Sequence, residues 1–277
     1  MSPVGSDEED LTRKQRREQA RAERKAMEEA AAAGAVRRTR LTQLGIVVAV
    51  VVVAVVVILI ATGGGKSKTP PKLGSTGATT TQRKVAALLD GIPQSANTLG
   101  SPTAPVTLKY FGDLECPICR EFTVEALPQI IPKWVRAGKL RIEYHSMETA
   151  THEPEVFKTQ QVAALAAGKQ DKAWNFIETF YHEQGEEDSG YVNEKYLQGI
   201  ASQIPGLNLA QWTSDRNEPE LANEVETDKQ VANNEGFTGT PSFLVGRSGG
   251  AMSKLEYSSS PGDPTFVNEA VEKLLKT

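Results

Sequence analysis

The sequence contains few cysteines, few histidines and few aromatic residues. Among its 277 residues there are two cysteines and three histidines, and aromatic residues make up 6%. Two cysteines exclude a scaffold held by several disulfides and a zinc site made of four cysteines. A basic excess is also missing, because the net charge is −4 and residues 83–277 carry more acidic than basic side chains. This charge balance argues against a nucleic-acid-binding protein.

Charged residues are absent from residues 41–65, and residues 44–61 are apolar apart from one glycine. As a helix, this apolar run would extend about 27 Å, close to the bilayer's hydrocarbon thickness of about 30 Å. Lipid offers no partner to backbone polar groups, so a spanning segment must be helical. About forty residues precede the run, which favours an uncleaved anchor over a cleaved signal peptide. The second reading stays open, since Ala61-Thr62-Gly63 loosely resembles a cleavage site.

Basic residues are more frequent just before this run than just after it. That bias predicts a single-pass cell-membrane protein with a cytoplasmic N-terminus and an extracytoplasmic C-terminal domain. The predicted parts are a charged cytoplasmic tail (1–40), a transmembrane signal-anchor helix (41–62), a flexible linker rich in Gly, Ser, Thr and Pro (63–82) and an extracytoplasmic domain (83–277).

Hydrophobic periodicity in the C-terminal domain alternates between strand and helix. The order predicts an α/β fold with an all-helical insertion at about residues 148–235. The expected strands are 105–112, 140–144, 242–246 and 254–258. The expected helices are 84–89, one starting at Pro117 with kinks at Pro128 and Pro132, 154–182, further helix within 193–236, and a final helix capped by Asp263-Pro264.

The two cysteines form a Cys116-Pro117-Ile118-Cys119 motif at the end of a strand and turn, where a helix begins. Free N–H groups and the positive end of the helix dipole favour a thiolate at such a position. Cys119 lies one turn further along and can close a small disulfide ring with Cys116. The motif therefore predicts that Cys116 exchanges disulfides with a substrate and that Cys119 resolves the mixed disulfide.

Other roles for the pair are weaker. A purely structural disulfide would close a very short loop and would stabilise the fold little through chain entropy. A metal site would need more ligands, and His145, His152 and His182 are scattered along the sequence. We therefore predict no metal site and read the histidines as ordinary surface or core residues.

Four segments in order resemble the DsbA-like branch of the thioredoxin superfamily, close to membrane-tethered thiol–disulfide oxidoreductases of the Gram-positive type. The resemblance covers roughly residues 83–277 and leaves out the tail and the apolar run. Its segments are LGSPTAPV (99–106), FGDLECPIC (111–119), AALAAGKQ (163–170) and GFTGTPSF (236–243).

The resemblance implies a thioredoxin fold with an all-helical insertion, in which Pro241 is cis and lies against the Cys116–Cys119 redox-active disulfide. It implies that Pro241 belongs to the catalytic set and that Pro117, Ile118 and Thr240 contact the substrate. No prosthetic group is expected. The implied partners are exported proteins with free cysteines and a quinone-linked membrane protein of DsbB or VKOR type that reoxidises the pair.

One position departs from the family pattern. Tyr110 stands six residues before Cys116, where these proteins usually carry a buried carboxylate, and a phenol cannot act as a base at neutral pH. We expect water, or an exposed acid such as Asp113 or Glu115, to accept the proton of Cys119. Together with Glu121, these acids are also expected to oppose a thiolate at Cys116.

The motif serves both directions of electron flow. The leading hypothesis is an enzyme that introduces disulfides into exported proteins. The alternatives are a reductase or isomerase of the same fold and a non-catalytic tethered chaperone or copper carrier.

Overall fold

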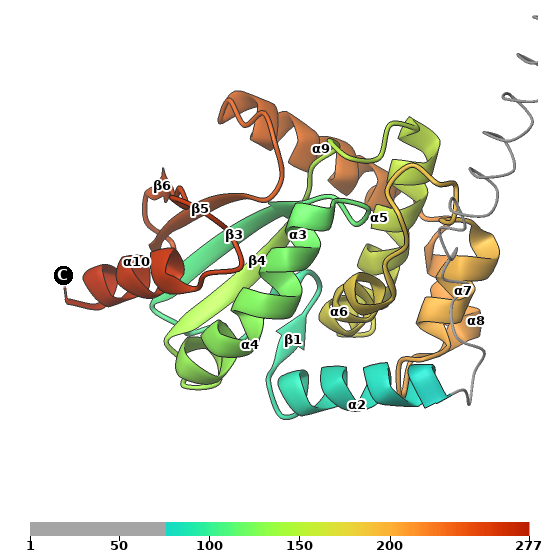
Figure 1. Ribbon diagram of the computed structural model, residues 1–277, viewed down its shortest axis with the longest axis horizontal. Coiled ribbons are helices and arrows are strands. Elements are labelled where there is room, and N and C mark those ends of the chain that lie inside the picture. Colours follow the sequence, from blue (N-terminus) through green and yellow to red (C-terminus); the bar gives the residue numbers. More distant parts are fainter. Residues whose placement is uncertain (1–75, 277) are drawn as a thin grey trace, which may run out of the picture. The chain divides into compact units, whose positions relative to one another are not determined.

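The computed structural model of the protein describes residues 76–276. Its centre is a mixed sheet with the strand order β1-β2-β4-β3-β5-β6 (Figure 1). Strands β3 and β4 pair in parallel, and the other neighbours are antiparallel. The strands are β1 (Gln94–Ser95), β2 (Thr98–Leu99), β3 (Val106–Gly112), β4 (Leu140–Ser146), β5 (Ser242–Arg247) and β6 (Met252–Lys254).

Helices surround this sheet, and α5 to α9 all fall between β4 and β5 in the sequence, where the helical insertion is expected (Figure 1). The α-helices are α2 (Thr76–Leu89), α3 (Pro117–Glu121), α4 (Leu127–Ile130), α5 (Pro154–Gly168), α6 (Ala173–Glu183), α7 (Glu194–Ala201), α8 (Leu209–Asp215), α9 (Pro219–Asn234) and α10 (Thr265–Lys276), and the π-helical turns are η1 (Phe122–Ala126) and η2 (Ile131–Val135).

The middle strand β3 is buried along nearly its whole length, on both faces of the sheet. Aromatic rings from β3, β5 and α10 form a cluster with Phe122, which directly follows the helix that carries the cysteines. The ring of Phe122 lies 4.9 Å from that of Tyr110 and 4.7 Å from that of Phe243, which itself lies 5.3 Å from Phe266. Burial of each ring contributes about 1.5–3 kcal/mol, so this cluster fixes η1, the turn that directly follows α3, against the sheet.

The helix that begins at Pro117 continues through both prolines at which we expected kinks. Pro128 lies in α4, between the two π-helical turns, and Pro132 lies in η2. A proline has no N–H to donate to the carbonyl one turn earlier. In the π-helical turns the backbone hydrogen bonds reach back five residues, as from the Leu127 N–H to the Phe122 carbonyl oxygen. These wider turns let the helix continue past the missing donors.

Residues 154–182 form two helices rather than the single predicted one. Helix α5 ends at Gly168, where a Cβ would lie 2.8 Å from the Ala96 carbonyl oxygen. A turn follows in which Asp171 has a φ of 56°. The close passage of the β1–β2 hairpin therefore ends α5, and no pattern within the helix itself signals that contact.

Other elements also differ from the predictions. Strand β6 spans Met252–Lys254 instead of 254–258, because the turn at Gly249 returns the chain to β5 early. Helix α2 begins at Thr76, so residues 76–82 of the predicted linker are helical. Its Thr81 is buried and donates a hydrogen bond to Glu183. The short strands β1 and β2 were not predicted.

The membrane span predicted for residues 41–62, the tail (1–40) and most of the linker lie outside the described residues. Between residues 76 and 276, no helix combines the length and apolar character needed to cross a bilayer.

Candidate active site

Cys116 caps the helix that carries Cys119. It has extended backbone angles, and its sulfur accepts a hydrogen bond from the Cys119 N–H at 3.4 Å, while Pro117 fills the first helical position. Both cysteines are free thiols. Cys116 is 5% exposed and Cys119 fully buried, whereas Pro117 and Ile118 face solvent. Any thiol from outside therefore meets Cys116 first.

The loop before β5 closes over this motif. The Thr240–Pro241 peptide bond is cis, as the resemblance implies. The Cys116 thiol donates a hydrogen bond to the Thr240 carbonyl oxygen at 3.5 Å. The fold thus brings residues 116–119 and 240–241 together, although more than a hundred residues separate them.

The two thiols have opposite proton affinities. Hydrogen bonding from the Cys119 thiol, together with contributions from Thr240 and the helix N–H groups, lowers the pKa of Cys116 to about 7 against an opposing effect of burial. Burial raises the pKa of Cys119 well above its usual value. The lowered pKa agrees with the thiolate expected at the helix start, and among its main causes burial, rather than charge from Asp113, Glu115 or Glu121, is what opposes it. Cys116 is therefore the nucleophilic and exchangeable sulfur.

Tyr110 occupies the place of the missing carboxylate directly beneath Cys119. Its hydroxyl lies 3.4 Å from the Cys119 carbonyl oxygen and donates to the Tyr181 hydroxyl at 3.2 Å. Tyr181 in turn donates to the Asp113 carbonyl oxygen at 3.0 Å. Burial raises the pKa of both phenols well above their usual range. The tyrosines therefore remain protonated and order the backbone of the site without accepting a proton.

Asp113 is a structural centre of the site. Its buried carboxylate accepts hydrogen bonds from the backbone N–H groups of residues 149–151, at 2.9 to 3.0 Å. It also accepts from the Thr151 hydroxyl at 2.6 Å and from the Glu115 N–H at 3.1 Å. Our expectation of an exposed proton acceptor at Asp113 was therefore wrong, because this carboxylate ties the cysteine turn to the loop after β4.

Glu115, the other acid expected to be exposed, is only 3% exposed. It lines a cavity of about 220 Å³ together with Val156, Asp188 and Val192. Burial is the main reason that its pKa rises to about 7. Neither candidate acid is thus the exposed base that we expected.

Two residues of the site were missed because their partners are distant in sequence. Gln184, just after α6, donates its amide to the carbonyl oxygens of Leu114 at 2.8 Å and Cys116 at 3.1 Å. Thr149 shares a hydrogen bond of 2.5 Å with the Thr240 hydroxyl. No local motif marks either residue, since only the folded chain brings them to the cysteines.

The histidines lie in separate environments. His145 pairs with Asp228 at 2.6 Å, His152 pairs with Asp188 on the surface, and His182 is partly buried. Burial lowers the pKa of His182 to about 4. Across residues 76–276, no group of histidine, cysteine and acidic side chains is arranged to hold a metal ion.

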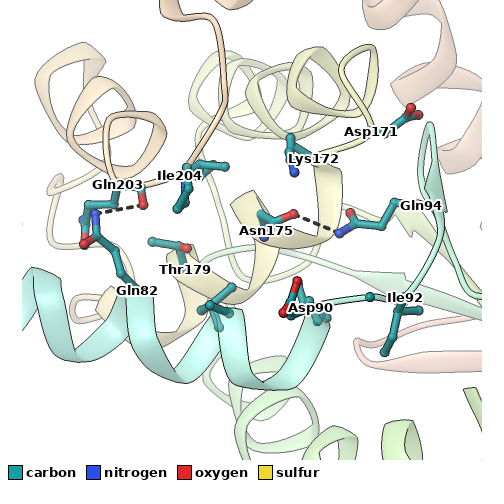
Figure 2. A pocket seen from close by; sticks show the side chains of 15 residues that line it. Gln82, Asp90, Ile92, Gln94, Asp171, Lys172, Asn175, Thr179, Gln203 and Ile204 are labelled. Atoms are coloured by element: carbon teal, nitrogen blue, oxygen red, sulfur yellow. Dashed lines mark hydrogen bonds between the residues drawn. The ribbon is translucent and has the colours of Figure 1, made fainter. Parts of the chain in front are cut away.

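A larger cavity, of about 350 Å³, lies between α2 and α6. Figure 2 shows the Gln94 and Asn175 side chains meeting at one side of it and Gln82 reaching Gln203 at the other. These hydrogen bonds measure 2.8 and 2.9 Å. No residue of the cysteine turn lines this cavity, so it is separate from the site described above.

Comparisons with known proteins agree with this geometry. A family model described as Thioredoxin matches residues 94–253. The "Probable disulfide bond formation protein D" of Bacillus anthracis is 26% identical over 185 residues, which is 64% of this chain and 77% of that protein. The disulfide bond formation protein D of Bacillus subtilis is 24% identical over 183 residues, covering 64% of this chain and 76% of that protein.

Solved structures show the same fold. Oxidised BdbD from Bacillus subtilis superposes with a TM-score of 0.56 at 21% identity, over 67% of this chain and 97% of that one. A variant of alpha-DsbA1 from Wolbachia pipientis gives 0.54 at 18% identity, over 69% and 96%. With its helical insertion and cis-proline loop, the chain belongs to the thioredoxin family and has the DsbA-like form of its fold.

Proposed function

We propose that the protein is a thiol–disulfide oxidoreductase that introduces disulfides into exported proteins through Cys116 and Cys119. The observation that carries this proposal is the asymmetry of the pair. Cys116 reaches the surface, caps a helix and has its pKa lowered to about 7, whereas Cys119 is buried and its pKa is raised. Disulfide exchange needs one accessible sulfur with a stabilised thiolate and one protected resolving sulfur.

The reaction follows from these positions. A client thiolate attacks the Cys116 sulfur of the Cys116–Cys119 disulfide, which forms a mixed disulfide and releases Cys119 as a thiolate that takes up a proton. A second client thiolate then attacks the client sulfur of the mixed disulfide. The client gains a disulfide, Cys116 leaves as a thiolate, and the protein holds both electrons. The two sulfurs carry the whole redox change, so no prosthetic group is needed.

The surface around Cys116 supports a role in holding an extended client. Pro117 and Ile118 flank the cysteine and are exposed, with Ile118 at 42%. Thr240 and Pro241 lie on the other side of the Cys116 sulfur, just before β5. In this proposal their backbone aligns the client chain, and the proline leaves no N–H there to pair with a neighbouring strand.

The proposal includes a cellular setting. The apolar run at residues 41–62 would anchor the protein in the cell membrane, with the tail (1–40) in the cytoplasm and the redox domain outside. Its clients would be exported proteins with free cysteines. A quinone-linked membrane protein of DsbB or VKOR type would reoxidise the pair, as the similarity to disulfide bond formation proteins suggests.

One observation favours reductase activity as a second candidate. The pKa of about 7 at Cys116 resembles that of thioredoxin more than the value of about 3.5 in DsbA. A less stabilised thiolate makes a weaker oxidant. A copper carrier fits less well, because it would bind the metal through two thiolates and burial raises the pKa of Cys119.

A Cys119→Ser variant of the full chain tests the proposed reaction. In this variant the Cys116 thiolate can still attack a client disulfide and form a mixed disulfide, releasing one client thiolate, but the Cys119 thiol that would displace the client from Cys116 is missing. Adducts with clients should therefore accumulate on non-reducing gels and disappear on reduction. A variant with both Cys116→Ser and Cys119→Ser is the matched control and should form none. If the Cys119→Ser protein is exported and folded but carries no adducts, the oxidoreductase proposal fails.

A further inference from the structure

The residues that line the cavity beside Glu115 take no part in the proposed disulfide exchange. Its lining includes the aliphatic residues Val156 and Val192 and the acidic residues Glu115, Glu153 and Asp188. Glu115 is 3% exposed although it directly precedes Cys116 in the chain. A volume of about 220 Å³ is large enough for one long side chain.

Within residues 76–276, the ionised Glu115 carboxylate has little hydrogen-bond support. The hydrogen-bonding side chain that acts on it is Thr151. The single hydroxyl hydrogen of Thr151 is donated to Asp113 at 2.6 Å, while Gln160 donates to the same hydroxyl oxygen. Across residues 76–276, no salt bridge to Glu115 is formed. A buried carboxylate without a donor or a cation is costly, unless a ligand supplies one.

The charged groups that act on Glu115 do not balance its negative charge. Asp113, Asp188 and Glu187 all act on it with the same sign of charge, and Tyr191, which packs close by, is neutral. His152 lines the same cavity but pairs with Asp188. The cavity therefore combines apolar walls with uncompensated negative charge, which suits an aliphatic stem that ends in a cation.

We propose that this cavity is a client subsite that takes an arginine or lysine side chain lying close in sequence to the client's reactive cysteine. The inference rests on the proposed function and specifies the class of client. Consecutive Cα atoms are about 3.8 Å apart and the Cα atoms of a disulfide about 5.5 Å, so a residue next to a client cysteine bonded to Cys116 lies at most roughly 13 Å from the Glu115 Cα. A side chain as long as that of arginine or lysine can span this gap, so its cation would pair with the Glu115 carboxylate and its aliphatic stem would contact the valines.

Single-cysteine peptides test the subsite. Each peptide carries arginine, or norleucine as its uncharged counterpart, at one position within three residues of the cysteine. The measured quantity is the rate at which the peptide thiol opens the Cys116–Cys119 disulfide at pH 8. This rate is divided by the rate of the same peptide with the uncharged bis(2-hydroxyethyl) disulfide, which removes the effect of arginine on the peptide thiol without adding a charge of its own. At the best position we expect a preference for arginine of about tenfold or more.

Two variants show which carboxylate carries the preference. Glu115→Gln should reduce the preference for arginine to within about twofold, because it removes the charge and keeps the shape. Glu125→Gln removes an exposed charge from the helix that follows Cys119 without touching the cavity, and should keep the preference. In the unmodified protein, the preference should also grow between pH 6 and pH 8, as Glu115 ionises around its pKa of about 7.

An equal normalised rate for both peptides, or a preference that survives Glu115→Gln, would overturn the subsite. That result differs from a failure of the proposed function. If the norleucine peptides still open the disulfide, the enzyme activity stands and only the client class is wrong. If no peptide reacts, the oxidoreductase proposal itself fails.

Discussion

Replacing Cys116 by serine should reduce the rate of client disulfide formation by about a thousandfold or more, to the uncatalysed level. Serine cannot form the mixed disulfide. Cys119 cannot take over, because it is fully buried beneath the helix start and its pKa is raised by that burial. The rate is measured as the loss of free thiols in a reduced client. The unmodified protein is added with its Cys116–Cys119 disulfide formed, and the variant, which cannot form that disulfide, is added under the same conditions.

The same variant separates chemistry from folding. The hydroxyl of the introduced serine would still accept the Cys119 N–H as a helix cap, so the free energy of unfolding should change by no more than about 1 kcal/mol relative to the reduced protein. Substantial activity in the variant would show that Cys116 is not the exchanging sulfur. A large loss of stability would instead make the activity result uninformative, and alanine at the same position would then be compared.

Replacing Glu178 by glutamine should stabilise the domain by about 3 kcal/mol at pH 7. Glu178 lies in α6 and is fully buried, and within the described chain neither of its carboxyl oxygens has a hydrogen-bond partner. Burial raises its pKa from 4.5 to about 8. Between these values the unfolded chain is ionised while the folded domain keeps the proton.

The sign of the pH dependence follows from this difference. The contribution of Glu178 to stability is fully present below about pH 4.5 and is lost by about 1.4 kcal/mol per pH unit as the pH rises toward 8. Glutamine does not titrate. The two proteins should therefore be about equally stable near pH 4 and should diverge steadily up to pH 8.

Urea unfolding of the two proteins at pH 4, 6 and 8 measures this divergence. The exposed Glu269→Gln in α10 is the matched control and should not change the pH dependence. Equal unfolding free energies for the original protein and Glu178→Gln at pH 8 would mean that Glu178 is not held protonated by burial.

Features with a local cause could be predicted from the sequence. The Cys116-Pro117-Ile118-Cys119 motif follows a strand and contains its own helix-start residue, so the capping position of Cys116 was expected. The alternation of residues 140–144 predicted β4. In both cases the residues that determine the structure lie within a few positions of one another. The cis peptide bond before Pro241 was instead expected from the resemblance to the DsbA-like family.

Features that depend on distant partners could not be predicted. Asp113 and Glu115 look like turn acids in the sequence, but the loop at residues 149–151 and the insertion bury them. Gln184 reaches the Cys116 carbonyl oxygen only because α6 ends beside the cysteine turn. The lowered pKa of Cys116 depends on Cys119 and Thr240 together, and the contribution of Thr240 comes from a residue 124 positions away in the sequence.

The direction of disulfide transfer tests the central claim most directly. The oxidised protein is mixed with an equimolar amount of a reduced, unfolded client that contains paired cysteines, and the free thiols of both are counted over time. The proposed function predicts that the client loses two thiols for each Cys116–Cys119 disulfide that is reduced. A client that stays reduced beside oxidised protein, or a reduced protein that instead opens the disulfides of an oxidised client, would contradict it.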